Sequence, residues 1–363
     1  MDARVKNLLQ KKHENVRVVF IDEYSMLNQP YLQIINKRLQ EIKGNDRLFG
    51  GVVLVMVGDT AQLPPVKGKP LYSRDARGCL SSQWLYFHQF TSVIELVESR
   101  RVDATDPDSA WFKDFLDRLA DAEVTQADYD KVCQMCSKHS MGVDEWNERG
   151  FGDPDITHLF STNADVDKHN KNALTSLANP IVKITAKNTS KWMKKLATDR
   201  CGQLTNVLFL ARDAKVTLTY NLCPELGLAN GSTGKVKDVV YLPGESPGGD
   251  EPDLPYCVWV EVDGYTGDSF FPAADGRDKW VPIFPRSHME VRKVRDNWRE
   301  EERTMIPLRL AWAWTIHKAQ GQTIKSKIVL NLGRKEMDHG LTYVAFSRAK
   351  KDWKYWYRWW YYI

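Results

Sequence analysis

The sequence predicts an α/β fold built on parallel strands, and three observations support this prediction. Two short runs rich in β-branched residues, Val16–Ile21 and Val52–Val57, indicate strands that are buried on both faces. Each run leads directly into polar residues, and a segment with helical character, Pro30–Lys43, separates the two runs. A strand, a helix and a second strand in this order form the βαβ unit of a parallel sheet. Ligands of such sheets bind at the carboxyl ends of the strands, which makes the polar residues a candidate site.

The polar residues after the two predicted strands suit phosphate chemistry. Asp22 and Glu23 follow the first strand, and Asp59 and Gln62 follow the second. One acid of an adjacent pair can hold Mg²⁺ through its water shell, while its neighbour orients or deprotonates an attacking water. Taken alone, an apolar run followed by two acids is also typical of a strand that ends in a polar turn. The functional interpretation therefore depends on the motifs that accompany the pair.

The rest of the first half is predicted to consist of short elements with marked ends. Asn28 is a candidate N-cap for the helix Pro30–Lys43, because its side chain can accept a hydrogen bond from a free backbone N–H group. The turn residues Gly44-Asn45-Asp46 are expected to end that helix. Val93–Val97 is predicted as a third strand. Two amphipathic helices follow, at Asp108–Ala122 and at Gln126–Ser140.

The second half begins after a linker at residues 142–153, so we expect a domain of residues 1–150 and another of residues 151–363. From about residue 241 to residue 304, Gly, Pro and Asp separate short alternating segments, which predicts a small all-β insertion. The stretch Lys183–Asp199 shows no regular pattern. The other expected elements are strands at Ile156–Phe160, Val216–Leu222, Tyr256–Val262 and Ile328–Leu332, and helices after Thr162 and at Leu341–Lys350.

Composition and charge exclude several classes of protein. The chain has 363 residues, of which 42% are hydrophobic and 27% charged, as expected for a globular protein of two domains. No apolar run approaches the roughly 20 residues of a membrane helix, and the first residues lack the apolar core of a signal peptide. The net charge of +4 permits nucleic-acid binding in a local groove but does not require it.

Cysteine usage favours a reducing, intracellular compartment, because six cysteines scattered over this length do not form a disulfide framework. Cys133, Cys136 and His139 have the spacing of metal ligands. They lie on one expected helix, however, and no second ligand pair follows at zinc-finger distance. We therefore expect no zinc site.

Four short motifs occur in order along the chain, and each is weak alone. They are DEYSM (Asp22–Met26), GDTAQLPPV (Gly58–Val66), TIHKAQGQT (Thr315–Thr323) and YVAFSRAK (Tyr343–Lys350). Together they resemble the second, third, fifth and sixth motifs of the superfamily-one helicases, and within these the petite-integration-frequency and RecD-like branch. The segments ANGSTGKV, STN and PLRLAWA also resemble that branch. The likeness therefore covers nearly the whole chain.

The resemblance implies two RecA-like parallel-sheet domains of the P-loop NTPase type, with the all-β insertion as a small SH3-like barrel. It implies ATP and Mg²⁺ as cofactors and single-stranded DNA as the partner of a monomer that moves 5′ to 3′. It also implies work in DNA repair, recombination or telomere maintenance, in the nucleus or mitochondrion of a eukaryote or in the cytoplasm otherwise. RNA stays open as the alternative strand, because backbone and stacking contacts carry little information about the sugar.

The resemblance also assigns roles around the nucleotide. Asp22 is expected to bind Mg²⁺ and Glu23 to act as the general base for water. Gln62 would contact the γ-phosphate and transmit its presence to the strand-binding surface. Gln320 and Gly321 are expected to contact the nucleotide as well.

Two arginines are expected to stabilise the phosphoryl group in flight from opposite sides of the cleft. Arg348 occupies the sixth-motif position, and Arg100 stands where the family has an arginine before a helix. The family usually has Gln after that arginine, whereas this chain has Arg101, so either of the two arginines could reach the phosphate. A bland alternative for Arg348 is a pair with a surface acid.

The fifth motif is expected to contact the nucleic acid, largely through backbone phosphates. His317, taken alone, could equally be a half-buried histidine with its hydrogen bonds satisfied. The expected contact residues are Thr315, His317, Lys318, Gln320 and Thr323.

The sequence departs from the family in one respect. The first motif, GxxxxGK[ST], whose backbone amides and lysine hold the β- and γ-phosphates, does not occur. The nearest string, Gly231–Val236, has the wrong spacing and no final Ser or Thr. We therefore expect the first domain to be a fragment that begins at its second motif. Two hypotheses follow: an ATP-driven translocase that is active in a longer parent, or a nucleic-acid-binding remnant without ATP turnover.

Overall fold

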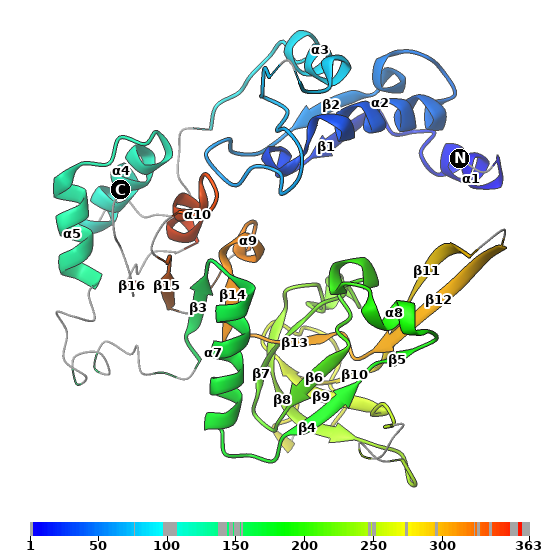
Figure 1. Ribbon diagram of the computed structural model, residues 1–363, viewed down its shortest axis with the longest axis vertical. Coiled ribbons are helices and arrows are strands. Elements are labelled where there is room, and N and C mark those ends of the chain that lie inside the picture. The colour runs from blue at the N-terminus through cyan, green and yellow to red at the C-terminus, as the bar shows by residue number, and fades with distance from the viewer. Residues whose placement is uncertain are drawn as a thin grey trace. The chain divides into compact units, whose positions relative to one another are not determined.

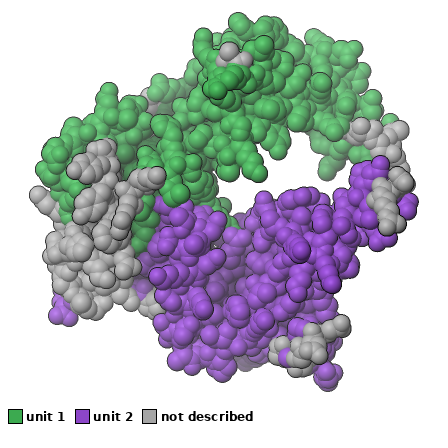
Figure 2. Space-filling model, viewed as in Figure 1, with its two compact units in different colours: residues 1–142, 316–363 green, residues 143–315 purple. Residues whose placement is uncertain are grey.

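The structure, a computed structural model, describes residues 3–75, 77–96, 107–136, 144, 148, 153, 155–245, 248, 252–272, 275–294, 297–322, 324, 327–333, 336–348 and 355–357. Two compact units emerge (Figure 1; Figure 2): unit 1 is residues 1–142 with 316–363, and unit 2 is residues 143–315. The break after residue 142 lies close to the boundary expected near residue 150, while residues 316–363 group with unit 1. The assignment of all of 151–363 to one motor domain stays a prediction.

Unit 1 contains a parallel strand pair and a set of helices from both ends of the chain. Its elements are α1 (Ala3–Lys12), β1 (Val18–Ile21), η1 (Tyr24–Met26), α2 (Gln29–Lys43), η2 (Leu48–Gly51), β2 (Val53–Met56), α3 (Leu80–Gln89), α4 (Pro107–Ala120), α5 (Gln126–Cys136), α9 (Ile316–Ala319), β15 (Ile328–Asn331), α10 (Leu341–Ser347) and β16 (Tyr355–Tyr357). Among the described residues, no helix combines the length and the apolar character that crossing a membrane requires.

The predicted βαβ unit is present. Strands β1 and β2 pair in parallel with Val18 opposite Val53, and α2 connects them. Asn28 caps α2 by accepting a hydrogen bond from the Tyr31 N–H group (3.3 Å). Gly44 ends the helix in a left-handed conformation, as the turn signal predicted.

The prediction that β1 and β2 are buried on both faces is wrong. One face packs toward α2 and α3, where Leu32 of α2 and Leu85 of α3 belong to a buried apolar cluster that Leu54 contacts. The opposite face is exposed, with Phe20 accessible over 70% of its surface and Val53 over 60%. The reason is that the sheet of β1 and β2 has two strands, and no described element covers its second face.

The prediction of a third strand at Val93–Val97 is also wrong for the residues that the structure describes. Residues 93–96 join no sheet, and their apolar side chains are exposed, Ile94 over 88% of its surface. Val97 lies outside the described residues. A β-branched run becomes a strand only if another strand satisfies its backbone N–H and C=O groups.

The helices α4 and α5 are held together by a buried ion pair. The Asp128 carboxylate accepts hydrogen bonds from Arg118 Nε (2.8 Å) and from the Thr125 hydroxyl (2.8 Å), which also caps α5. Trp111 Nε1 donates to the same carboxylate at 3.2 Å. The predicted helices are confirmed here, although α5 is described only to Cys136 and residues 137–140 lie outside the described part.

Unit 2 is mainly antiparallel. Its elements are β3 (Thr157–Phe160), α7 (Asn163–Ser176), β4 (Val182–Thr185), β5 (Lys187–Asn188), α8 (Lys191–Lys195), η3 (Thr198–Cys201), β6 (Val207–Leu210), β7 (Lys215–Leu218), η4 (Pro224–Leu226), β8 (Thr233–Val240), β9 (Cys257–Val262), β10 (Trp280–Ile283), β11 (Arg286–Val294), β12 (Asn297–Met305), β13 (Leu308–Leu310) and β14 (Ala313–Thr315). Strand β14 pairs in parallel with β3, which α7 follows.

The all-β region is wider than the predicted range of 241–304. A five-stranded sheet has the order β10-β9-β8-β7-β13, so it begins at Lys215 and ends at Leu310, and β11 and β12 form a ribbon that pairs with β5. The core of unit 2 lies against this sheet and includes Val236, Val258 and Ile283. The SH3-like form of this region stays a prediction.

Residues 183–199 form regular secondary structure, although their sequence shows no regular pattern. The fully buried Arg303 on β12 donates hydrogen bonds to the carbonyl oxygens of Met193, Leu196 and Leu204 and to Asn188 Oδ1. A guanidinium offers five donors in a fixed plane, so one side chain can hold several turns of chain at once. These elements depend on a residue more than a hundred positions away, which local patterns do not reveal.

We predict that Asp128→Asn lowers the free energy of unfolding by about 2–4 kcal/mol at pH 7, because the partly exposed Arg118 loses the buried carboxylate that pairs with it. The Arg118 hydrogen bonds hold the pKa of Asp128 well below its usual range. A lowered carboxyl pKa stabilises the fold fully above the ordinary value near 4, and this stabilisation is lost as the pH falls below it. Urea unfolding of both proteins at pH 7, 5 and 3.5 should therefore show a difference that shrinks at the lowest pH. The exposed Asp121→Asn is the control, and equal effects of the two substitutions would contradict the prediction.

We also predict that Phe20→Lys reduces self-association of this chain, because a charge on the exposed apolar face opposes contact between copies. Sedimentation velocity over a range of concentrations measures the effect. Leu242→Lys places the same charge at another exposed apolar position, in unit 2, and serves as the control. If both variants change the sedimentation profile equally, net charge rather than this face governs association.

Candidate functional site

The two acids after β1 lie on a strained turn. Glu23 has φ 52° and ψ 42°, a left-handed conformation that is uncommon for a residue with a side chain. Its backbone N–H group donates to Asp22 Oδ1 at 2.9 Å. Asp22 is exposed and Glu23 half-buried, so the turn directs the two carboxylates into different surroundings. Such strain often occurs at functional positions.

The fifth motif reaches Glu23 within unit 1. Gln320 Nε2 donates to Glu23 Oε2 at 3.0 Å, although the two residues are 297 positions apart. Gln320 is only 8% exposed, and its Oε1 atom is buried without a hydrogen-bond partner among the described residues. Gly321 lies beside them in a left-handed conformation, and a Cβ atom there would lie 3.5 Å from Glu23 Oε1. The structure therefore brings Glu23, Gln320 and Gly321 together, while their contact with the nucleotide stays a prediction.

The third-motif loop begins directly after β2 and is closed by Asp59. Asp59 Oδ1 accepts the Ala61 N–H hydrogen bond (2.9 Å), and Oδ2 accepts bonds from Gln62 Nε2 (3.4 Å) and from the Tyr343 hydroxyl (2.9 Å). Tyr343 comes from α10, 284 residues away. Burial, and then the nearby Asp59 carboxylate, raise the pKa of Tyr343, so the phenol remains a donor at physiological pH.

Arg348 is buried against its own helix. Its guanidinium is 2% exposed and donates to the Val344 carbonyl oxygen (3.2 Å), the Gln322 carbonyl oxygen (3.4 Å) and the Ser347 hydroxyl (2.9 Å). These contacts are to neutral oxygen atoms, and the role of Arg348 at the phosphate stays a prediction. Arg100 and Arg101 lie outside the described residues, so their role stays a prediction.

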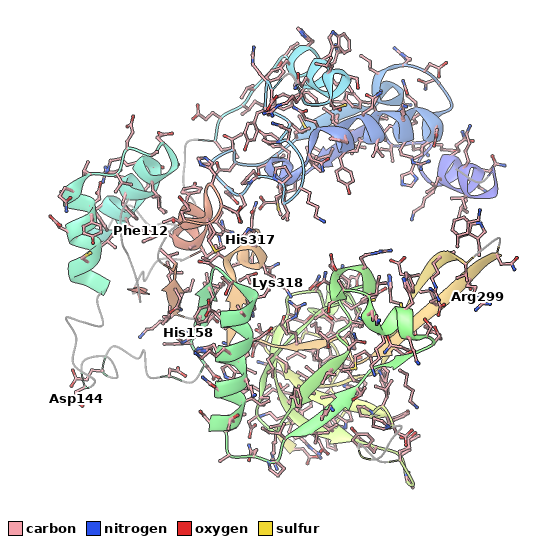
Figure 3. All side chains as sticks on the ribbon, viewed as in Figure 1. Phe112, Asp144, His158, Arg299, His317 and Lys318 are labelled. Carbon is pink, nitrogen blue, oxygen red and sulfur yellow. The ribbon has the colours of Figure 1, made fainter. Side chains whose placement is uncertain are left out.

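The predicted nucleic-acid contacts lie on and beside the short helix α9, where His317 and Lys318 are found (Figure 3). His317 Nε2 lies 3.0 Å from Asp338 Oδ2, and the side chain is partly exposed. Thr315 ends β14, and Thr323 lies outside the described residues. His317 in this structure is thus a half-buried histidine whose ring nitrogen has a partner, as the alternative interpretation expected.

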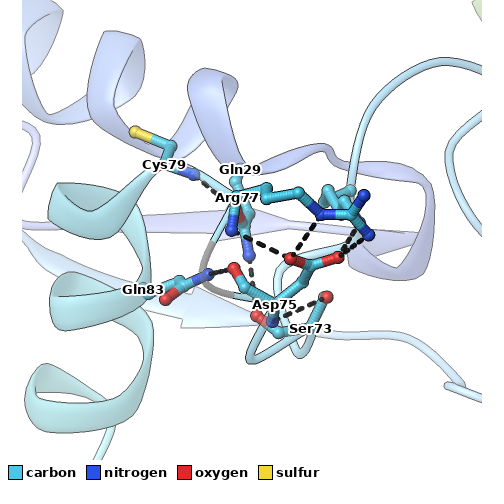
Figure 4. Close-up of polar contacts among 7 residues, drawn as sticks. Gln29, Ser73, Asp75, Arg77, Cys79 and Gln83 are labelled. Atoms are coloured by element: carbon cyan, nitrogen blue, oxygen red, sulfur yellow. Dashed lines mark hydrogen bonds and ion pairs between the residues drawn. The ribbon is translucent and has the colours of Figure 1, made fainter.

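The loop that follows the third motif is anchored to the start of α2 by the buried Gln29 (Figure 4). Its Nε2 donates to the Ser73 carbonyl oxygen (2.7 Å), and its Oε1 accepts from the Cys79 N–H group (2.8 Å). Asp75 accepts bonds from the Arg77 backbone (2.8 Å) and guanidinium (3.1 Å), which hold the pKa of Asp75 well below its usual range. Sequence patterns do not single out Gln29, because its function depends on a loop more than forty residues away.

The described residues contain no group of three or more His, Cys, Asp or Glu side chains that could hold a metal ion by themselves. The pair Asp22 and Glu23 nevertheless fits Mg²⁺ chemistry, because this ion keeps most of its water shell and binds through one or two carboxylates together with phosphate oxygens. Asp22 is exposed, and its Oδ1 atom accepts the Glu23 N–H hydrogen bond. The assignment of Asp22 to this ion stays a prediction.

Comparison with known proteins gives concordant results. Residues 2–130 match the family described as PIF1-like helicase. An ATP-dependent DNA helicase Pif1 of Psychrobacter is 25% identical over 372 residues, which cover 95% of this chain and 54% of the relative. The ATP-dependent DNA helicase PIF1 of Danio rerio is 28% identical over 342 residues, covering 92% and 44%. The chain thus spans about half the length of the curated relatives it matches.

Solved structures agree on the fold. The crystal structure of the Pif1 helicase from Candida albicans has a TM-score of 0.69 and 26% identity, and the match covers 98% of this chain and 74% of that one. A Pif1 helicase from Bacteroides, solved in complex with ADP-AlF3 and single-stranded DNA, has a TM-score of 0.67 at 22% identity, covering 98% and 73%. These likenesses confirm the prediction of a mixed α/β, RecA-like fold with two domains.

Proposed function

We propose that this chain, whose residues 2–130 match the PIF1-like helicases, is a superfamily-one helicase and forms part of a motor that uses ATP to move 5′ to 3′ along single-stranded DNA. The observation that carries the proposal is the meeting of the second, third, fifth and sixth motifs at the carboxyl edge of β1 and β2. Ligands of open parallel sheets bind at this edge. The relatives named above are ATP-dependent DNA helicases.

Each acid would have a separate task at this edge. Asp22, exposed to solvent, would hold Mg²⁺ against the phosphates of ATP. Glu23, half-buried and fixed by Gln320, would accept a proton from the attacking water. The ion, when bound, would neutralise charge that develops on the phosphates.

Arg348 would supply positive charge to the transferring phosphoryl group after its side chain leaves the contacts with Val344, Ser347 and Gln322. Arg100 or Arg101 would supply a second charge from the other side. His317 and Lys318 would contact the backbone of the single strand, together with Thr315 and Thr323.

We also propose that the motor needs a phosphate loop that this sequence does not contain. The exposed apolar face of β1 and β2 and the exposed apolar residues 93–96 support this idea, because a working motor would cover both with further strand and helix. Without amides and a lysine to hold the β- and γ-phosphates, the nucleotide cannot be aligned with the water near Glu23.

We predict that the 363-residue chain hydrolyses no ATP, even with single-stranded DNA present, and that turnover returns when the phosphate-loop segment of a relative is joined ahead of residue 1. In that longer chain, Glu23→Gln should leave ATP binding intact and lower the turnover rate by about 10²–10⁴-fold, because only water activation is lost. A steady-state ATPase assay measures both effects, with Glu225→Gln, in unit 2, as the matched control. Turnover of several per second by the 363-residue chain that vanishes in Glu23→Gln would contradict the prediction.

We predict that single-stranded DNA binds with strong salt dependence through a local groove that includes Lys318. Each neutralised phosphate contributes roughly −0.7 to the slope of log K against log salt, so Lys318→Ala should make the slope shallower by about that amount. Fluorescence anisotropy with an oligothymidylate from 50 to 300 mM salt measures the slope. The exposed Lys171→Ala on α7 is the control. An unchanged slope for Lys318→Ala would remove this lysine from the groove, and the same titration with an oligouridylate compares DNA with RNA.

A further inference from the structure

The hydrogen bonds around Asp59 determine the orientation of the Gln62 carboxamide, that is, whether its NH₂ group or its oxygen faces Asp59. A carboxylate only accepts hydrogen bonds, so the Gln62 group that lies 3.4 Å from Asp59 Oδ2 must be its NH₂ group. If the amide were turned round, two oxygens would face each other at that distance. The Oε1 atom of Gln62 therefore points away from Asp59, and it is buried without a hydrogen-bond partner among the described residues.

An unpaired amide oxygen selects its ligand chemically. It accepts a hydrogen bond from a water or another O–H or N–H group, but it repels the oxygens of a phosphate, which carry no hydrogen. The contact expected from the resemblance, in which Gln62 meets the γ-phosphate directly, requires the NH₂ group instead. In this structure one of the two N–H bonds of that group is directed at Asp59.

Asp59 is in turn held by α10. The Tyr343 hydroxyl donates to the same Oδ2 atom at 2.9 Å, a shorter and better hydrogen bond than that of Gln62. The start of α10 also lies close to the third-motif loop. Gly340 has φ +78°, and a Cβ atom there would lie 2.4 Å from the Ala61 carbonyl oxygen. The raised pKa of Tyr343 keeps the phenol protonated, so its O–H group donates to the Asp59 carboxylate, which can only accept.

We infer that Tyr343 is a positioning residue: through Asp59 it holds Gln62 with its amide oxygen presented, so that this oxygen accepts a hydrogen bond from the attacking water. The inference rests on the proposed ATPase function and refines the role of Gln62 within it. The sixth motif thereby acts on the third motif through a neutral phenol, in addition to any charge that Arg348 supplies. Glu23 would remove the proton of the water, and Gln62 would fix its direction.

The positioning step can be tested on the 363-residue chain without any turnover. Side-chain amide ¹⁵N–¹H spectra report the Gln62 NH₂ group, whose signal is assigned by its disappearance in Gln62→Met. In Tyr343→Phe we expect this signal to move and its exchange with solvent to accelerate about fivefold, as loss of one neutral hydrogen bond from the network implies. Tyr241→Phe removes another buried hydroxyl, in unit 2, and should leave the signal unchanged. An unmoved Gln62 signal in Tyr343→Phe overturns the inference.

The choice between water and phosphate is tested on the full chain joined to a phosphate-loop segment. Tyr343→Phe and Gln62→Met should lower kcat, by about tenfold for Tyr343→Phe, while the affinity for a non-hydrolysable ATP analogue stays within twofold. A tenfold loss of that affinity in both variants overturns the assignment to water. If the joined chain without substitutions has no turnover, the proposed function fails, and the amide spectra and analogue binding still decide the roles of Tyr343 and Gln62.

Discussion

The parallel pairing of β1 and β2 is the constraint on which the candidate site depends. Each strand has only four residues, but the backbone pairing continues past both strand ends, where the Tyr24 N–H group donates to the Val57 carbonyl oxygen at 3.1 Å. Because the strands run in the same direction, the acids at positions 22 and 23 and the polar loop 59–62 leave the sheet at one edge. An antiparallel pair would have sent them to opposite ends.

Neutral donors from the C-terminal part of the chain then fix these acidic groups. Gln320 binds Glu23, and Tyr343 binds Asp59, so a hydrogen bond from a neutral group limits the freedom of each carboxylate. An arginine in either place would form an ion pair and use up the charge that the chemistry needs. Arg348, which carries a positive charge, instead donates hydrogen bonds to its own helix and to Gln322.

The exposed apolar surface of unit 1 has a related physical origin. The sequence of β1 and β2 has the composition of strands covered on both faces, yet α2 and its neighbours supply apolar contacts to one face. The apolar side chains of residues 93–96 are exposed as well, and no strand among the described residues pairs with this segment.

The sequence by itself determined the elements whose signals are local: the two parallel strands, the capped helix α2, the amphipathic helices α4 and α5, and the order of the motifs. Tertiary structure decided the rest. Burial of β1 and β2 depends on what covers them, the regular structure of 183–199 depends on Arg303, and the positions of Tyr343 and Gln29 depend on loops far away in sequence. The physical reason is that a cap or a periodic apolar face is completed by residues within a few turns, whereas a buried hydrogen bond or a sheet face is completed by whichever distant segment satisfies it.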